Sequence, residues 1–167
     1  MIGVEWVRLM ARYNSWQNGQ VMAVVKRLPE AELVADRGAF FGSILSTLNH
    51  LVWADQLWMQ RFDGGEGPQV PPEDSTRCCP TAAAWEAERF RLDGRIRVWA
   101  AGLREIDLRG DLQWRSVSAG QEFRKPIGVC VTQLFNHQTH HRGQVHAMLT
   151  SIGSDPGVTD LPFLPGE

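Results

Sequence analysis

The histidines are the residues of this chain whose type and spacing could do chemistry. Four of the five fall within one ten-residue stretch, from His137 to His146. In a helix, residues four apart rise from one face with Cβ atoms about 5–6 Å apart, so His137 and His141 could bind one metal ion. They could also hydrogen-bond to a buried hydroxyl, a carbonyl or water, and an HxxxH spacing without the Glu of HExxH is a loose motif. Steps of three and four residues place the pair on an apolar stripe with Leu134, Val145 and Met148.

The remaining histidine, His50, lies in the segment SILSTLNHLVWADQLW. Most of its neighbours at helical spacing are apolar, which favours an inward orientation. In helical bundles, metal sites are built from side chains on facing helices. His50 with His137 and His141 would supply three nitrogen ligands and leave open positions for water or substrate. Imidazole nitrogens suit zinc, nickel, copper and iron, so the residues do not select one divalent ion.

The elements that must position these histidines are helices. Apolar periodicity predicts four long ones, over about residues 3–28, 43–62, 81–106 and 126–153. Pro29 ends the first helix, Ser43 is a candidate N-cap of the second, and Pro126 opens the fourth. The expected architecture is therefore all-α, a four-helix bundle. A chain of 167 residues can bury about 68–70% of its unfolded surface in one core, so we expect residues 1–167 to form a single domain.

The segments between the helices are predicted to be short or irregular. Residues 64–80 hold several prolines and read as a loop. Residues 112–123 carry Trp114, Val117 and Phe123 around a Ser-Ala-Gly-Gln turn, which predicts a short β-hairpin before the last helix. The last fourteen residues contain three prolines and are expected to lie along the helices as a tail.

Composition narrows the class of protein. The formal charge is −2, from 17 basic and 19 acidic residues, and no basic block occurs, so nucleic-acid binding is not indicated. An odd count of cysteines, Cys78, Cys79 and Cys130, does not make a disulfide framework and fits a reducing compartment. No run of about 18 apolar residues predicts a membrane span. We expect a soluble, cytoplasmic protein.

Three segments together resemble the DinB family, the damage-inducible four-helix-bundle proteins of bacteria. They are YNSWQN in the first helix, STLNHLVWADQLW in the second and LFNHQTHHRGQVHAML in the fourth. The resemblance implies an up-down-down-up bundle, often paired into a homodimer, and a divalent metal held by His50, His137 and His141. Relatives in this superfamily include metal-dependent transferases and isomerases that use low-molecular-weight thiols such as bacillithiol, mycothiol or glutathione.

Other residues are candidates for supporting roles. Tyr13, Asn14 and Gln17 put polar groups halfway along the first helix, where they could contact the metal ligands or line a dimer or solvent face. Cys130 lies seven residues before His137. It could lie near the metal, or it could be a small buried apolar residue. Gly143 suggests a close helix approach, because a glycine within a helix costs about 1 kcal/mol relative to alanine.

Further polar residues are given no role in the chemistry. His140 is expected at the surface or beside the metal ligands, and His146 at the surface. Cys78 and Cys79 lie in the predicted loop and are expected to be open to surface oxidation at most. No catalytic or cofactor-binding residue is assigned.

Two functions of different class fit this pattern. One is a metal-dependent enzyme that transfers a cofactor thiol to a small electrophile, in a stress or damage response. The other is a non-catalytic stress protein in which the metal is structural or sensory. A di-iron carboxylate site is excluded, because no Glu in the chain is followed three residues later by His.

Overall fold

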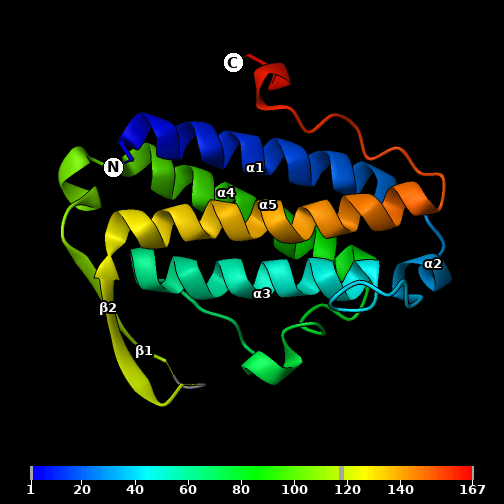
Figure 1. The fold of residues 1–167 in the computed structure, drawn as a ribbon, viewed down its shortest axis with the longest axis horizontal. Helices are drawn as coiled ribbons and strands as arrows, with labels where there is room; N and C mark the ends of the chain where they lie inside the picture. The colour runs from blue at the N-terminus through cyan, green and yellow to red at the C-terminus, as the bar shows by residue number, and fades with distance from the viewer. Residues whose placement is uncertain (1, 117–118, 167) are drawn as a thin grey trace.

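The protein is mostly helical, as the computed structural model shows for residues 2–116 and 119–166. Four long helices lie side by side (Figure 1). They are α1 (Val4–Val25), α3 (Ile44–Asp63), α4 (Ala82–Gly102) and α5 (Ile127–Ser151). A short helix, α2 (Glu30–Val34), follows α1 and buries Leu33 at one end of the long helices. It was not predicted, since five residues are too few to show a helical period.

Local sequence signals set several of the helix ends. The Ser43 hydroxyl accepts a hydrogen bond from the backbone N–H of Ser46, which confirms Ser43 as the N-cap of α3. The Thr81 hydroxyl caps α4 in the same way, through the N–H of Ala84. Gly64 ends α3 in the left-handed region at a φ of 72°, a conformation that favours glycine.

The predicted end of the third helix was wrong. α4 stops at Gly102, and residues Glu105–Leu108 form a separate 3-10 turn, η2, in which Ile106 is 61% exposed. The Asp107 carboxylate accepts hydrogen bonds from the backbone N–H and the side chain of Arg104, which stabilises a new turn in place of a continued helix.

The predicted hairpin is confirmed. Strand β1 (Asp111–Ser116) pairs antiparallel with β2 (Gln121–Pro126), and Trp114 lies opposite Phe123. It extends from the end of the helices opposite to α2 (Figure 1). Trp114 packs edge-on against Trp58 of α3, with ring centroids 5.7 Å apart, and so joins the hairpin to the helices. Val117, which was expected in this hairpin, lies outside the described residues.

The loop and the tail take up their predicted places. Residues 64–80 contain one 3-10 turn, η1 (Pro72–Asp74), and return along α3. After α5 the chain turns back along α1 and includes a third 3-10 turn, η3 (Leu161–Phe163). The Tyr13 hydroxyl and the Gln17 amide donate hydrogen bonds to backbone carbonyls of this tail, at Thr159 and Val158.

A closed ring of buried polar side chains joins all four long helices. Arg89 of α4 forms ion pairs with Asp55 of α3, at 2.8 Å, and with Asp93, at 2.9 Å. Burial raises the pKa of the Asp55 carboxyl against the opposing pull of Arg89. The ring consists of Asn14, Asn18, Asp55, Arg89, Asp93, Gln138 and Arg142, each no more than 6% exposed.

Amide side chains complete this ring. The Gln138 amide donates to Asp55 at 2.5 Å, and its carbonyl oxygen accepts from Arg142 at 3.2 Å. Arg142 also donates to the carbonyl oxygens of Asn14 and Asn18, and Asn18 donates to Asp93. In the sequence, Arg89 and Asn14 interrupt apolar stripes, and such an interruption does not indicate which residue on another helix is the partner.

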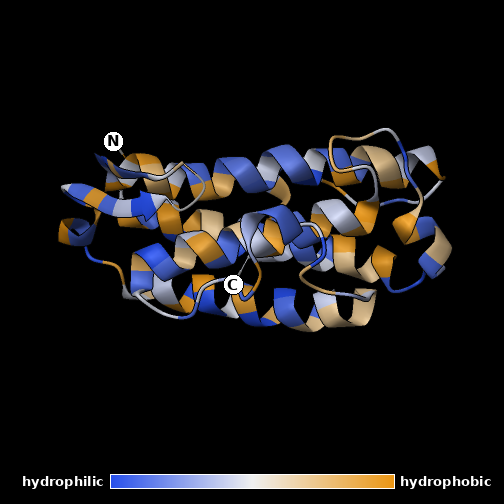
Figure 2. Cartoon of the chain, turned by 90° about the horizontal axis from the view of Figure 1, so that it is seen from below, coloured by the Kyte–Doolittle hydropathy of each residue, from blue (hydrophilic) through white to orange (hydrophobic). Residues whose placement is uncertain are grey.

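Each long helix carries both polar and apolar residues along its length (Figure 2). Within the described part of the chain, no helix is long and apolar enough to cross a membrane.

Replacing Arg89 with Met tests how much this ring contributes to the stability of the fold. Arg89→Met leaves the buried carboxylates of Asp55 and Asp93 without their cation, and removal of one partner of a buried ion pair costs about 3–5 kcal/mol. We expect a loss of this size in the free energy of unfolding, measured by urea denaturation. Arg91→Met, which removes an exposed ion pair with Glu88 on the same helix, is the matched control and should change the midpoint little. Equal midpoints for the two variants would contradict the assignment.

Candidate metal centre

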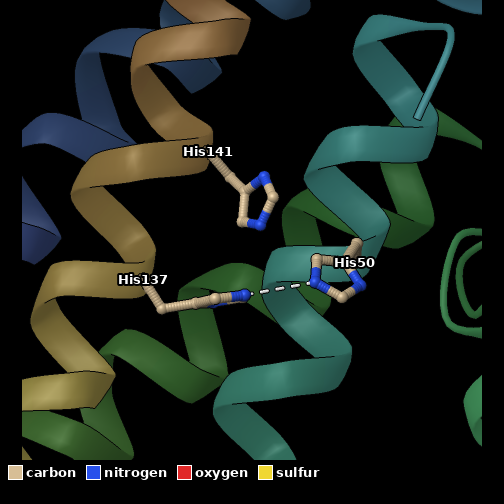
Figure 3. Close-up of side chains that lie close together, drawn as sticks. All are labelled: His50, His137 and His141. Atoms are coloured by element: carbon tan, nitrogen blue, oxygen red, sulfur yellow. Dashed lines mark hydrogen bonds between the residues drawn. The ribbon is translucent and has the colours of Figure 1, made fainter. Parts of the chain in front are cut away.

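The structure brings together the three histidines predicted from the sequence. His50 of α3 faces His137 and His141 of α5, and the imidazoles converge on the space between the two helices (Figure 3). One potential ligand atom from each residue lies within 4.8 Å of the other two. The Nε2 atoms of His50 and His137 are 3.2 Å apart.

These separations fit a shared metal ion. With Zn–N bonds of about 2.0–2.1 Å, two nitrogens on a tetrahedral zinc lie about 3.3 Å apart, close to the distance between His50 and His137. A direct N–H···N hydrogen bond accounts for that pair as well, but it leaves the third ring out. Nε2 of His141 has no hydrogen-bond partner among the described residues, whereas a cation could bind all three rings. The site therefore has the donor set of a three-imidazole metal centre.

The environment keeps these imidazoles neutral, which is the form that binds a metal. Burial, followed by the charge of His141, lowers the pKa of His50 to about 4. Burial and the neighbouring histidines lower the pKa of His137 to about 4 as well. Burial also lowers the pKa of His141, although its hydrogen bond to Gln144 opposes the shift. Three rings that stay uncharged at neutral pH can approach one another without repulsion.

Contacts behind the triad fix how two of the rings are turned. Nδ1 of His141 lies 2.9 Å from the Gln144 carbonyl oxygen, so its N–H points there and Nε2 is left to face the other rings. Nδ1 of His50 lies 3.3 Å from the hydroxyl of Ser75, a buried residue that directly follows η1. The ring of Phe41 lies 4.2 Å from that of His50 and 5.2 Å from that of His141, and shields one side of the site.

None of these three neighbours was predicted from the sequence. Ser75 and Phe41 lie in connecting segments, where no periodicity indicates which way a side chain points. Gln144 was a recognisable candidate, because it lies three residues after His141 on the same helix.

The polar residues predicted on α1 do not contact the triad. Asn14 accepts a hydrogen bond from Arg142, and Tyr13 and Gln17 hold the C-terminal tail. The prediction that these three residues support the metal ligands was wrong, because their side chains bind partners in the polar ring and in the tail. The alternative of a dimer or solvent face is also wrong for Asn14, which is 2% exposed.

The cysteines take structural positions. Cys130 is buried in α5, and burial raises the pKa of its thiol, so it behaves as a small apolar residue. Cys79 is buried, which corrects the expectation of surface oxidation for this residue, whereas Cys78 is half-buried. Both contact Asn49, whose side chain exchanges hydrogen bonds with the Cys79 backbone. Asn49 directly precedes His50, so this contact ties the loop to α3 beside the triad.

The other two histidines of this segment are not part of the triad. His140 is exposed, with its ring 4.7 Å from that of His141, and His146 is half-buried. A Cβ atom on Gly143 would meet nothing within 4 Å. The predicted close approach of another helix at Gly143 is therefore absent among the described residues.

The chain is similar to known proteins along nearly its whole length. The sequence profile described as "DinB family" matches residues 4–166. The chain is also 25% identical over 155 residues to "Protein DinB" of Bacillus subtilis (strain 168), an alignment that covers 89% of this chain and 87% of that protein.

Removing one histidine should abolish tight metal binding while the helices remain. Loss of a group behind a ligand already weakens metal binding about 10- to 100-fold, so His141→Ala, which removes a ligand, should weaken zinc binding more than about 100-fold. The measurement is the metal content per chain by elemental mass spectrometry after dialysis, with helix content followed by circular dichroism. His146→Ala is the control and should keep its metal. Retention of stoichiometric metal in His141→Ala would remove this residue from the site.

Metal binding should resist mild acid. Protons displace a metal only as the pH approaches the pKa of its ligands, and the pKa of His50 and of His137 is lowered to about 4. Zinc affinity should therefore change little between about pH 7.5 and 6 and fall steeply toward pH 4, as measured by competition with a zinc indicator dye. Histidines with the ordinary pKa of about 6.5 would lose affinity already below pH 7, and that profile would contradict the burial of the site.

Proposed function

Because the chain belongs to the DinB family, we propose that it is a divalent-metal protein in which His50, His137 and His141 hold the ion. The observation that carries this proposal is the convergence of three neutral imidazoles from two facing helices. We propose zinc or nickel as the bound ion, since both bind imidazole nitrogen well.

The bundle order belongs to the same proposal. We infer that the long helices form the up-down-down-up bundle of the family. Along α3 and α4, the residue numbers of the contacting pairs increase in the same direction, as expected for parallel helices. Asp55 contacts Arg89, and Asp63 contacts Arg95. Contacts between α1 and α4 run in opposite senses, with Asn18 on Asp93 and Lys26 on Glu86.

The chemistry that this site supports best is transfer of a thiol to a small electrophile. A divalent metal bound there lowers the pKa of a coordinating thiol or water and so supplies a nucleophile at neutral pH. The chain contributes three ligands and no fourth among the described His, Cys, Asp and Glu residues, which favours a site with room for an incoming group. Gln144 and Ser75 hold the ligand rings in orientation, and Phe41 excludes water from one side.

Several expectations from the sequence stay predictions. They are the homodimer, the cytoplasmic setting, the small-molecule substrate and the link to stress or damage. The nucleophile is expected to arrive with a low-molecular-weight thiol, because Cys130 is buried and the pKa of its thiol is raised.

Thermal unfolding of the zinc-loaded protein with candidate thiols tests this function. A ligand at about 100 times its Kd adds about 2.7 kcal/mol, and 1 kcal/mol shifts the Tm of a protein of this size by about 2–4 °C. One of bacillithiol, mycothiol and glutathione should therefore raise the Tm by about 5–10 °C. The S-methylated form of that thiol should not, because it lacks the group that meets the metal. The His50→Ala variant should show no thiol-dependent shift.

The same experiment separates the two classes of function. If zinc itself raises the Tm while no thiol shifts it further, and no thiol is consumed when an electrophile is added, the metal is structural or sensory and the transferase proposal fails.

A further inference from the structure

A cavity lies on the other side of α5 from the triad, between α1, α5 and the C-terminal tail. Its volume is about 410 Å³, within the range of small-molecule sites. Arg142 lies among its lining residues, together with Tyr13, Val21, Gly143 and Pro156. None of the three metal-site histidines lines it.

Arg142 is a buried cation without an anion beside it. It is 6% exposed, and no carboxylate lies within ion-pair distance of it in the described part of the chain. Its partners Asn14, Asn18 and Gln138 are neutral amides. The nearby aspartates, Asp55 and Asp93, are paired with Arg89 instead. A buried charge paired only through amides favours an anion that can approach it.

The guanidinium also has donors to spare. All three of its hydrogen bonds use Nη1. Nε and Nη2 have no hydrogen-bond partner among the described residues, and neither atom is completely buried. Both therefore reach open space, and the cavity is the space that Arg142 lines. The Nε and Nη2 edge of a guanidinium is a planar fork that matches the two oxygens of a carboxylate.

The walls of the cavity are held in place, and around Arg142 they combine apolar side chains with polar ones. The apolar ones are Tyr13, Val21 and Pro156, and the polar ones are Gln17, Thr139, His146 and Thr159. The guanidinium carbon of Arg142 lies 5.6 Å from the centre of the Tyr13 ring. Pro156 of the tail is buried. The tail is tied to α1 by hydrogen bonds from Tyr13 to the Thr159 carbonyl, at 2.5 Å, and from Gln17 to the Val158 carbonyl, at 2.9 Å. The tail, which runs back along α1 (Figure 1), is therefore fixed in position on this side of the cavity.

We propose that this cavity binds a small organic acid, with the carboxylate on the Nε and Nη2 edge of Arg142 and the apolar part between Tyr13 and Pro156. This site is separate from the metal centre, so the proposal stands whether or not the thiol chemistry is correct.

Gly143 offers a way to close the cavity without disturbing the ring. It lines the cavity, and a Cβ atom there meets nothing within 4 Å. Leucine forms helices better than glycine, so Gly143→Leu should fold while its side chain occupies the space of the ligand. Gly94→Leu on α4 is the matched control, since Gly94 is also exposed within a helix, has no atom within 4 Å of its Cβ position, and lies outside the cavity.

The test is a titration of the full-length protein with benzoate, followed by NMR of the backbone amides. We expect saturable shifts at Gly143 and Thr159 in the wild type and in Gly94→Leu, and affinity at least about tenfold weaker in Gly143→Leu. Benzamide, which has the same shape without the charge, should give no saturable shifts.

Three results would overturn the proposal. The first is the absence of saturable shifts with benzoate in the wild type, and the second is an equal response to benzamide. The third is unchanged benzoate affinity in a folded Gly143→Leu variant. If that variant does not fold, Thr139→Leu, one turn before Gly143 on the same cavity wall, takes its place with the same expected loss.

Discussion

Two arginines and two aspartates are buried between the four long helices, and their need for partners is the constraint on which the rest of the structure depends. Taking these charges out of water is costly unless each is paired or hydrogen-bonded. The ring that joins Arg89, Asp55, Gln138 and Arg142 gives each charged group at least one polar partner from α3, α4 or α5, and the amides of α1 close it. A shift of any helix by one turn would break several of these bonds at once, so the ring fixes how the helices lie against one another.

The metal centre depends on this arrangement through α5. Gln138 directly follows His137, and Arg142 directly follows His141. Because the two ring residues are held toward the buried network, the two histidines on the adjoining face are held toward α3 and His50. Beyond Arg142, the helix turns Gly143 toward the tail. Three neighbouring faces of α5 thus take part in the ring, in the metal centre and in the cavity that Arg142 lines.

The sequence predicted the parts of the fold that have local or periodic signals. The Ser43 cap and the hairpin follow from local sequence signals, and the inward orientation of each of the three histidines follows from the apolar residues at helical spacing on its own helix. The ring was not predicted from the sequence. Periodicity shows only that Arg89 or Asn14 is a polar residue in an apolar stripe, and the partners of both lie on other helices. Ser75 and Phe41 were missed for a related reason: they reach the site from connecting segments whose path is set by tertiary contacts. The early end of α4 is accompanied by local hydrogen bonds between Arg104 and Asp107, which compete with a continued helix.

X-ray absorption at the metal edge of the zinc-loaded protein tests the central claim most directly, because it reports the ligands of the ion itself. We predict three imidazole nitrogens at about 2.0–2.1 Å, with any further ligand an oxygen from solvent. A spectrum with sulfur ligands, or with at most one imidazole, would place the metal elsewhere and contradict the assignment of His50, His137 and His141.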